Sequence, residues 1–461
     1  MLSAETMALV RKRQIQTLKL IPKPKTTLLT KASTLKSLEA AWNKLNKSNP
    51  ESRGLSNETI SDFKSSLKSH IKQIQLELRS GNFKFGQVKA HLLPKKEKDK
   101  FRPLRIGDIK DRLVQKAISL QLERLLSKKY NLDNPCSFAY LEDKGIDKAI
   151  KAMVAHFKNG NRIILEADIK KFFDSVNRQR LLDKVFKALP DQSLNNLIED
   201  ALSQTVGNMS FIESKHKHYF EDSINGIPQG NSISPLLANI YLSGFDKRMM
   251  DEKICLVRYA DDFIILCKSA DEAQKALLIA RDELENKLEL ELHSLPTPNH
   301  AKNNDKGEKN KTRIIDPFYH EFSFLSIRFD GKKLWPEPKK IEDFHDKLKD
   351  IIDVSQYRKG EFQGILTIIK RFKNLLEGYL AAYKFVDIDR NFQEIDNLIN
   401  HYLLNALLNL GFKIKESHTQ KFYIKSKKKE LNGITTLQRK NIGVPLCIDF
   451  IKKIERNQII L

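Results

Sequence analysis

Three aspartates combine the residue type and the placement that metal-assisted phosphoryl transfer needs. Asp168 directly follows a short β-branched run, and Asp261 and Asp262 lie between two strongly apolar runs. Two Mg2+ ions about 3.5–4 Å apart require hard oxygen ligands from separated chain positions. Phosphoryl transfer is catalysed mainly by positioning and charge neutralisation. Ions held here would lower the pKa of an attacking hydroxyl and hold a triphosphate with its leaving pyrophosphate.

The segments around these aspartates predict the elements that position them. Residues 163–167 read as a strand that ends at Asp168, so its carboxylate is exposed at a strand end. Residues 254–257 and 263–267 predict two strands joined by a tight acidic turn with the sequence RYADD at 258–262. An Asp-Asp pair alone is more often a solvated turn, but a turn between such strands usually carries Gly or Asn. The context therefore favours a catalytic role for this Asp-Asp pair over a solvated turn.

The rest of the chain alternates helical and strand-like segments. Residues 87–93 and 102–106 predict a basic hairpin, and residues 294–310 predict a polar loop. Helical apolar spacing recurs in several segments, namely 35–78 (two helices), 109–126, 181–202, 235–249, 272–290 and 341–410.

The charge balance indicates a polyanionic partner. The chain of 461 residues has 81 Lys and Arg against 58 Asp and Glu, a net charge of +23. Such an excess attracts phosphate backbones, although a generic basic surface is the alternative. No apolar run approaches the ~20 residues that span a bilayer, so we expect no membrane partner and a cytoplasmic location. The scattered cysteines predict reduced core thiols, and the dispersed histidines predict structural or surface roles.

Three segments taken in order resemble successive palm motifs of the bacterial and group II intron-like reverse transcriptases. These segments are ILEADIKKFFDSVNRQRLL, GIPQGNSISPLLANIYLSGFD and RYADDFIIL. Upstream, LPKKEKDKFRPLRIGDIKDRLVQKAI resembles the fingers, and CSFAYLEDKGIDKAI resembles the next motif. Downstream, LELELH, KTRI and FSFLSIRF resemble the closing palm motifs, and the helices around GYLAAYKF resemble the thumb. The resemblance covers residues from about 30 to about 410.

The resemblance implies an α+β right-hand polymerase fold, with fingers, a palm built on an antiparallel sheet flanked by helices, and a helical thumb. The expected division is a basic arm at 1–30, N-terminal helices and fingers at 31–160, a palm with interleaved fingers elements at 161–335, a thumb at 336–410 and a basic tail at 411–461.

The resemblance also assigns roles to single residues. Asp168 and Asp261 match the metal ligands, Asp262 matches the second acidic residue of the turn, and the Ile169 carbonyl is a further ligand. Two Mg2+ ions are implied, with Mn2+ as a substitute. The remaining matches are a sugar-gating aromatic at Phe173, triphosphate contacts at Lys95 and Arg102, base-pair contacts at Gln229 and Gly230, a proton donor at Lys311 and a primer-end contact at Tyr259.

The less specific interpretations of these residues stay open at this point. Phe173 could be a core aromatic beside Phe172, and Lys95 and Arg102 could belong to a solvated basic hairpin. If the ring of Phe173 does meet a ribose 2′-hydroxyl, the resemblance implies deoxynucleotide substrates.

The expected function is an RNA-directed DNA polymerase that copies an RNA template into DNA from dNTPs. No cysteine and histidine pairs of a nuclease region, no Val-Thr-Gly signature and no integrase are present in the sequence. These exclusions favour a stand-alone, defence-associated enzyme that copies a structured noncoding RNA. Two alternatives remain, a group II intron maturase with secondary polymerase activity and a nonenzymatic nucleic-acid-binding scaffold. The priming mode, a homo-oligomer and an accessory protein are left open.

Overall fold

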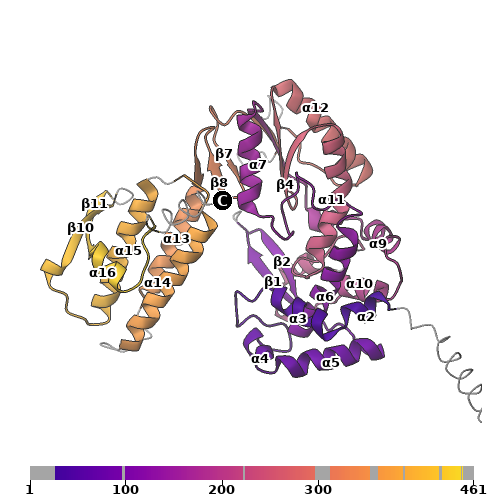
Figure 1. The fold of residues 1–461 in the computed structure, drawn as a ribbon, viewed down its shortest axis with the longest axis horizontal. Coiled ribbons are helices and arrows are strands. Elements are labelled where there is room, and N and C mark those ends of the chain that lie inside the picture. The colour runs from indigo at the N-terminus through magenta and orange to yellow at the C-terminus, as the bar shows by residue number, and fades with distance from the viewer. Residues whose placement is uncertain are drawn as a thin grey trace, which may run out of the picture. The chain divides into compact units, whose positions relative to one another are not determined.

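The computed structural model describes residues 26–95, 99–221, 224–295, 312–353, 362–387, 390–424, 428–447 and 449. The chain forms two compact units (Figure 1), the first of residues up to 161 and 165–314, the second of 162–164 and residues from 315 onward. The sequence predicted that the palm ends at 335, whereas residues 315–335 cluster with the second unit. The mixture of helices and sheets confirms the predicted α+β class.

The first unit combines a helical N-terminal part, a two-stranded hairpin and a four-stranded sheet. Its helices are α2 (Leu28–Ala32), α3 (Leu35–Lys44), α4 (Ile60–Ser65), α5 (Leu67–Ser80), α6 (Ile109–Leu126), α7 (Ile146–Lys158), α8 (Phe172–Ser175), α9 (Arg178–Phe186), α10 (Asn195–Leu202), α11 (Ser234–Asp251) and α12 (Ala270–Arg281), with the short helices η1 (Met209–Phe211), η2 (Ser214–Phe220) and η3 (Asp282–Lys287). Its strands are β1 (Lys89–Pro94), β2 (Phe101–Ile106), β3 (Ile163–Ala167), β4 (Cys255–Tyr259), β5 (Asp262–Cys267) and β6 (Arg313–Ile315). The first two residues of β3 and the last residue of β6 cluster with the second unit.

Local signals explain where several of these helices begin. The side chain of Thr34 accepts a hydrogen bond from the Ser37 amide at the start of α3. Thr59 and Asp62 form a reciprocal capping box at the start of α4. Such caps satisfy backbone donors that have no partner within the helix. The predicted arm of residues 1–30 reaches the described part at residue 26, and there Thr27 caps α2.

The four-stranded sheet places the predicted acidic segments on neighbouring strands. Its order is β4-β5-β3-β6, so β3 lies next to β5 although many residues separate them along the chain. Helices α7, α11 and α12 pack against β4 or β5. Most of β5 is buried, from Phe263 to Cys267, because its apolar side chains contribute to the core on both faces. This buried sheet is the rigid base of the candidate site.

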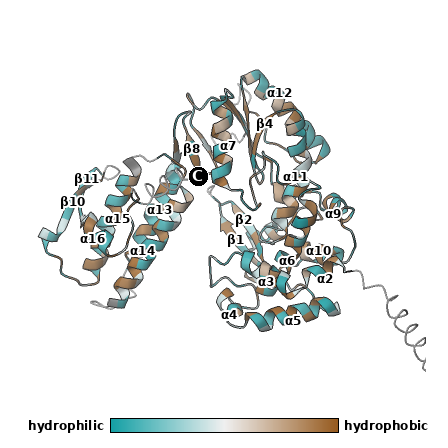
Figure 2. Cartoon of the chain, viewed as in Figure 1, coloured by the Kyte–Doolittle hydropathy of each residue, from teal (hydrophilic) through white to brown (hydrophobic). Residues whose placement is uncertain are grey.

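The second unit contains a three-stranded sheet, a helical bundle and a second hairpin. Its elements are β7 (Phe322–Phe324), β8 (Ile327–Phe329), β9 (Leu334–Pro336), α13 (Pro338–Ile351), α14 (Phe362–Ala382), α15 (Arg390–Asn409), η4 (Glu416–His418), β10 (Thr419–Ile424), β11 (Lys429–Ile434) and α16 (Thr436–Asn441). Figure 2 shows apolar and polar residues alternating around α14, whose Ile368, Phe372 and Leu376 are buried. The sequence predicted only a basic tail after residue 410, but much of that stretch is folded.

Two expectations from composition can be compared with the structure. Among the described residues, no helix combines the length and the apolar character needed to cross a bilayer. The four cysteines are free thiols, and three of them are buried. Three of the four therefore agree with the prediction of core cysteines, and their reduced state stays a prediction.

A buried carboxylate on α6 connects three separate segments of the first unit. Asp111 is fully buried. Its Oδ2 accepts hydrogen bonds from the Gly86 amide at 2.9 Å and from Gln204 Nε2 at 3.1 Å. Gln115 Nε2 in turn donates to Gln204 Oε1 at 2.7 Å. Burial raises the pKa of Asp111 to about 6.

We predict that Asp111 makes the stability of the protein depend on pH. An acid whose folded pKa exceeds its unfolded value of about 3.9 contributes stability at low pH that is lost as pH rises through the folded value. From about pH 5 to about pH 8, this group should cost about 1.4 kcal/mol of unfolding free energy. The Asp111→Asn protein should lack this contribution to the fall in unfolding free energy. Urea unfolding of both proteins at both pH values measures it, and equal losses would contradict the prediction.

Candidate active site

The turn that carries Asp261 has a strained backbone. Strands β4 and β5 pair antiparallel, with Tyr259 opposite Asp262, so Ala260 and Asp261 form a two-residue turn. Ala260 has a φ of 59°, a left-handed conformation that glycine usually takes at the first position of such a turn. A strained conformation persists when its surroundings determine it, and the buried Arg258 supplies that constraint.

Arg258 is completely buried beneath the turn. Its Nη1 donates to the Ala260 carbonyl at 2.8 Å and to Asn239 Oδ1 at 3.2 Å. Its Nε and Nη2 form a two-pronged ion pair with Asp246 of α11, and Nη2 also donates to Ser137 Oγ at 2.8 Å. Such forked pairs fix geometry as well as charge. The turn is therefore fastened to α11 and to the segment around residue 137.

The three predicted aspartates share one electrostatic site. Burial first, and then the nearby Asp168 carboxylate, raises the pKa of Asp261. Asp262 is accessible to solvent yet densely surrounded by protein atoms. That crowding, followed by repulsion from Asp261 and Asp168, raises its pKa to about 7. Carboxylates that repel one another in this way are stabilised when a divalent cation lies between them.

The carboxylates fit Mg2+ as part of a ligand shell. No three or more acidic, histidine or cysteine side chains within the described ranges converge closely enough to hold a metal ion by themselves. Mg2+ usually binds through one or two carboxylates together with water and substrate phosphates. The oxygen donors of Asp168, Asp261 and Asp262 match that mode.

The Ile169 carbonyl, which the resemblance implies as a further metal ligand, lies between two backbone hydrogen bonds. Ile169 bridges Leu292, through hydrogen bonds from His293 N to Asp168 O at 3.1 Å and from Lys170 N to Glu291 O at 2.8 Å. These two bonds do not use the Ile169 carbonyl. The imidazole Nε2 of His293 lies 3.6 Å from Asp168 Oδ2, so this histidine is part of the site, whereas the sequence predicted structural or surface roles for all histidines.

Phe173 lies where two of the predicted motifs meet. Its ring is half-buried and packs edge-on against Phe172, with centroids 5.3 Å apart. Its carbonyl accepts a hydrogen bond from the Ile227 amide at 2.8 Å. Phe172 is the core aromatic of the pair, because it is buried. Phe173 therefore remains the candidate for contact with a substrate.

The Gln229–Gly230 loop rests directly on strand β2. The Arg105 amide donates to the Gln229 carbonyl at 2.8 Å. Gly230 has a φ of 101°, and a Cβ added there would lie 2.7 Å from the Arg105 carbonyl oxygen. Only glycine satisfies both the conformation and the close approach. The loop and the hairpin are thereby held together.

Two residues of the basic hairpin lie within electrostatic reach of the acidic residues. Arg102, exposed on β2, acts electrostatically on both Asp261 and Asp262 and opposes the rise in their pKa values. Lys95, also exposed, acts in the same way on Asp174, one residue after Phe173. Tyr259 is half-buried directly before the turn. Lys311, the predicted proton donor, and most of the predicted loop at 294–310 lie outside the described residues.

The sequence did not identify several residues that complete the site. Tyr140 has a φ of 65°. Its side chain is 48% exposed, but the protein atoms around it, followed by the Asp261 carboxylate, raise the pKa of its hydroxyl. Glu166 on β3 accepts a hydrogen bond from Arg313 Nε at 2.6 Å. Arg258 offered the clearest sequence signal, because an arginine within an apolar strand needs a buried partner.

A family model and several known proteins are similar to this part of the chain. The family model "Reverse transcriptase (RNA-dependent DNA polymerase)" matches residues 93–294. An uncharacterized 91 kDa protein in the cob intron of Schizosaccharomyces pombe is 30% identical over 278 residues, 58% of this chain and 32% of that protein. The group II intron-encoded protein LtrA of Lactococcus lactis subsp. cremoris is 28% identical over 202 residues, 44% of this chain and 31% of that protein.

A solved structure of apo telomerase from Candida tropicalis is 13% identical with a TM-score of 0.40, and the match covers 81% of this chain and 72% of that one. The chain spans about a third of the length of the two curated relatives named above. The α+β architecture places acidic residues on adjacent strands, with a basic hairpin before them in the chain. Residues 93–294 are a reverse transcriptase domain, related in sequence to part of a group II intron-encoded protein.

Proposed function

We propose that the chain is an RNA-directed DNA polymerase that uses two Mg2+ ions, with Mn2+ as a substitute. One observation carries the proposal, namely that Asp168 directly follows β3 while Asp261 and Asp262 lie at the start of β5, the neighbouring strand of the same sheet. The three carboxylates also interact electrostatically. When bound, the ions would activate the primer 3′-hydroxyl and neutralise charge on the triphosphate. The family match over residues 93–294 supports this chemistry.

The protein side chains have separate tasks in this proposal. Asp168, Asp261, Asp262 and the Ile169 carbonyl present oxygens to the ions, and Arg258 keeps the turn in position. Arg102 and Lys95 bind the triphosphate, since a guanidinium and an ammonium suit phosphate oxygens. Gln229 and Gly230 lie against the new base pair, and Tyr259 contacts the primer end.

Primer extension tests the proposed function. The purified chain is incubated with a primed RNA template, dNTPs and Mg2+, and complementary DNA is measured by sequencing. We expect template-dependent DNA that disappears when Mg2+ is chelated. The absence of DNA from every primer type, RNA, DNA or unprimed, would refute a polymerase and favour the scaffold alternative.

A second function is favoured by the name of one relative, a group II intron-encoded protein. In that case the chain would act as a maturase, binding an intron RNA and assisting its splicing. We propose a different biological role ahead of this one, namely that the chain copies a structured noncoding RNA in cytoplasmic antiphage defence. RNA that copurifies with the protein from its host separates the two, because a maturase carries its intron and a defence enzyme carries one dedicated noncoding RNA.

We predict that Phe173→Ala admits ribonucleotides. The half-buried ring beside Phe172 would clash with a ribose 2′-hydroxyl, and the smaller side chain removes that clash. The preference for dNTP over rNTP, measured as the ratio of kcat/KM values, should fall on the order of 10²-fold. Phe211→Ala is the matched control, because that phenyl ring is 86% exposed in the same unit. An unchanged preference in Phe173→Ala would place the sugar gate elsewhere.

A further inference from the structure

Residues 411–447 form a small folded module on α15, here named the hairpin module. It consists of η4, the β10–β11 hairpin and α16. Gly433 lies so close to α15 that an added Cβ would be 2.8 Å from the Asn400 carbonyl carbon. Arg439 is completely buried and pairs with Asp396 of α15 at 3.0 Å. The hairpin module is therefore firmly held by the helix beneath it.

The charge of this part of the chain is strongly positive. Residues 411–449 contain nine Lys and Arg against three Asp and Glu. Arg439 pairs with Asp396, and Lys440 pairs with Asp449 at 2.6 Å. The other lysines that the structure describes here are exposed and make no ion pair with any described residue, and these are Lys413, Lys415, Lys421, Lys428 and Lys429. An external polyanion is the natural complement of such a surface.

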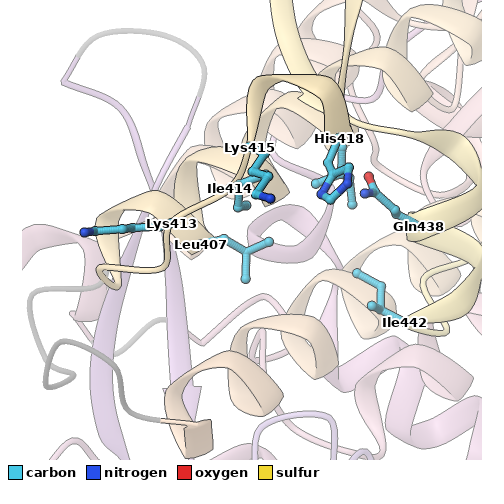
Figure 3. Close-up of a pocket in the computed structure, with 8 residues that line it drawn as sticks. Leu407, Lys413, Ile414, Lys415, His418, Gln438 and Ile442 are labelled. Atoms are coloured by element: carbon cyan, nitrogen blue, oxygen red, sulfur yellow. The ribbon is translucent and has the colours of Figure 1, made fainter.

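A hollow of about 460 Å³ opens between α15 and the hairpin module. Leu407 and Ile442 lie on one side of it, and Lys415, His418 and Gln438 lie together on the other (Figure 3). Gln438 Oε1 accepts from the Thr435 amide at 2.8 Å, which fixes the side chain and leaves its Nε2 to donate. An apolar side facing a few polar groups is the usual make-up of a ligand site.

Strand β10 continues this polar surface away from the hollow. Phe422 and Ile424 are buried against α15, so the alternate side chains of Lys421 and Tyr423 point outward on one face. Tyr423 is 55% exposed. Exposed aromatic rings next to cations are the means by which proteins hold single-stranded nucleic acid, through base stacking and phosphate contacts.

We propose that the hairpin module binds single-stranded RNA, with one base in the hollow and another stacked on Tyr423. Leu407 and Ile442 would cover the face of the first base, while Gln438 Nε2 and His418 meet its polar edge. Lys415 and Lys421 would contact phosphates between the two bases. Thr419, the first residue of β10, directly follows His418 of the hollow. Tyr423 lies four residues further along the strand, about 13 Å away, a distance that several nucleotides span. The choice of RNA as the strand rests on the proposed function, which brings an RNA template to this chain.

Photo-crosslinking of the full chain tests the position of the strand. The probe is an RNA of about 10 nucleotides that contains 4-thiouridine, used without Mg2+ and without dNTPs. Crosslinked peptides identified by mass spectrometry should include Tyr423 or the segment 415–418. Crosslinks confined to the first unit would overturn the proposal. Because the assay needs no catalysis, it can succeed even if the chain proves not to be a polymerase.

Fluorescence anisotropy with the same RNA tests the chemistry. Tyr423→Ala should weaken binding about tenfold, whereas Tyr423→Phe keeps the ring and should bind like the wild type. Lys421→Gln should lower the salt dependence of binding by about one unit of slope. Tyr319→Ala is the control, since that tyrosine is 83% exposed in the same unit.

Wild-type affinity of Tyr423→Ala would overturn the proposal. So would an equal loss for RNA and for a polyglutamate peptide, because the surface would then recognise charge alone. Thermal melting of each variant shows that it is folded, and Tyr423→Phe provides a folded comparison if Tyr423→Ala is not.

Discussion

Replacing Asp261 with asparagine is expected to reduce DNA synthesis by at least about 1,000-fold. The amide has the same shape as the carboxylate but carries no negative charge to bind a divalent ion. Asp261 lies within electrostatic reach of Asp168 and Asp262, so its loss removes one of three neighbouring carboxylates from the proposed metal site. RNA affinity should stay within a few fold, because the proposed phosphate contacts come from the basic surface and not from the acidic turn.

The measurement is single-turnover extension of a primed RNA template at saturating Mg2+, alongside RNA binding by filter retention. Asp271→Asn is the matched control, since it removes an exposed carboxylate from the first turn of α12. An Asp261→Asn protein that extends primers at the wild-type rate would remove the turn from the mechanism. Equal losses of extension and RNA affinity would show that the turn shapes the whole fold.

The second large effect is expected on stability. Asp246→Asn removes the negative partner of Arg258, and both side chains are only 1% exposed in the ion pair. Breaking a buried pair leaves an uncompensated buried charge, which costs about 3–5 kcal/mol. Arg258 also donates to the Ala260 carbonyl, so the Ala260–Asp261 turn should lose order before the whole unit unfolds.

The same helix provides the control for this prediction. Asp251 pairs with Lys247 at 2.5 Å, but the two side chains are 58% and 71% exposed. Asp251→Asn should change the free energy of unfolding by less than about 1 kcal/mol. Urea unfolding of the two variants and the wild type measures both changes. Similar small losses in both variants would mean that Arg258 finds another partner or that water reaches it.

The sequence was sufficient to predict the acidic turn and the strand that ends at Asp168. Their signals are local, because alternating apolar runs and a short acidic interruption determine a hairpin without help from distant residues. The placement of Phe173 and of the Gln229–Gly230 loop depended on the family resemblance, and the structure brings their backbones together. The individual roles of these residues stay predictions.

The sequence could not reveal which distant residues support the turn. Arg258 and Asp246 are twelve residues apart, but Arg258 also reaches Ser137 across 121 positions, and no local pattern encodes that contact. Tyr140 and His293 were missed for the same reason. The hairpin module was predicted as a tail because lysines dominate its composition, while its buried contacts with α15 involve single residues such as Gly433 and Arg439.

The order of strands in the four-stranded sheet has a consequence for a newly made chain. The β4–β5 hairpin closes through a two-residue turn, so it can form within about 1–10 μs of its synthesis. Strand β3 leaves the ribosome roughly a hundred residues earlier, and its pairing with β5 must close that long loop, which is a slower event. In a nascent chain, the Asp261–Asp262 turn is therefore expected to form before Asp168 is brought beside it.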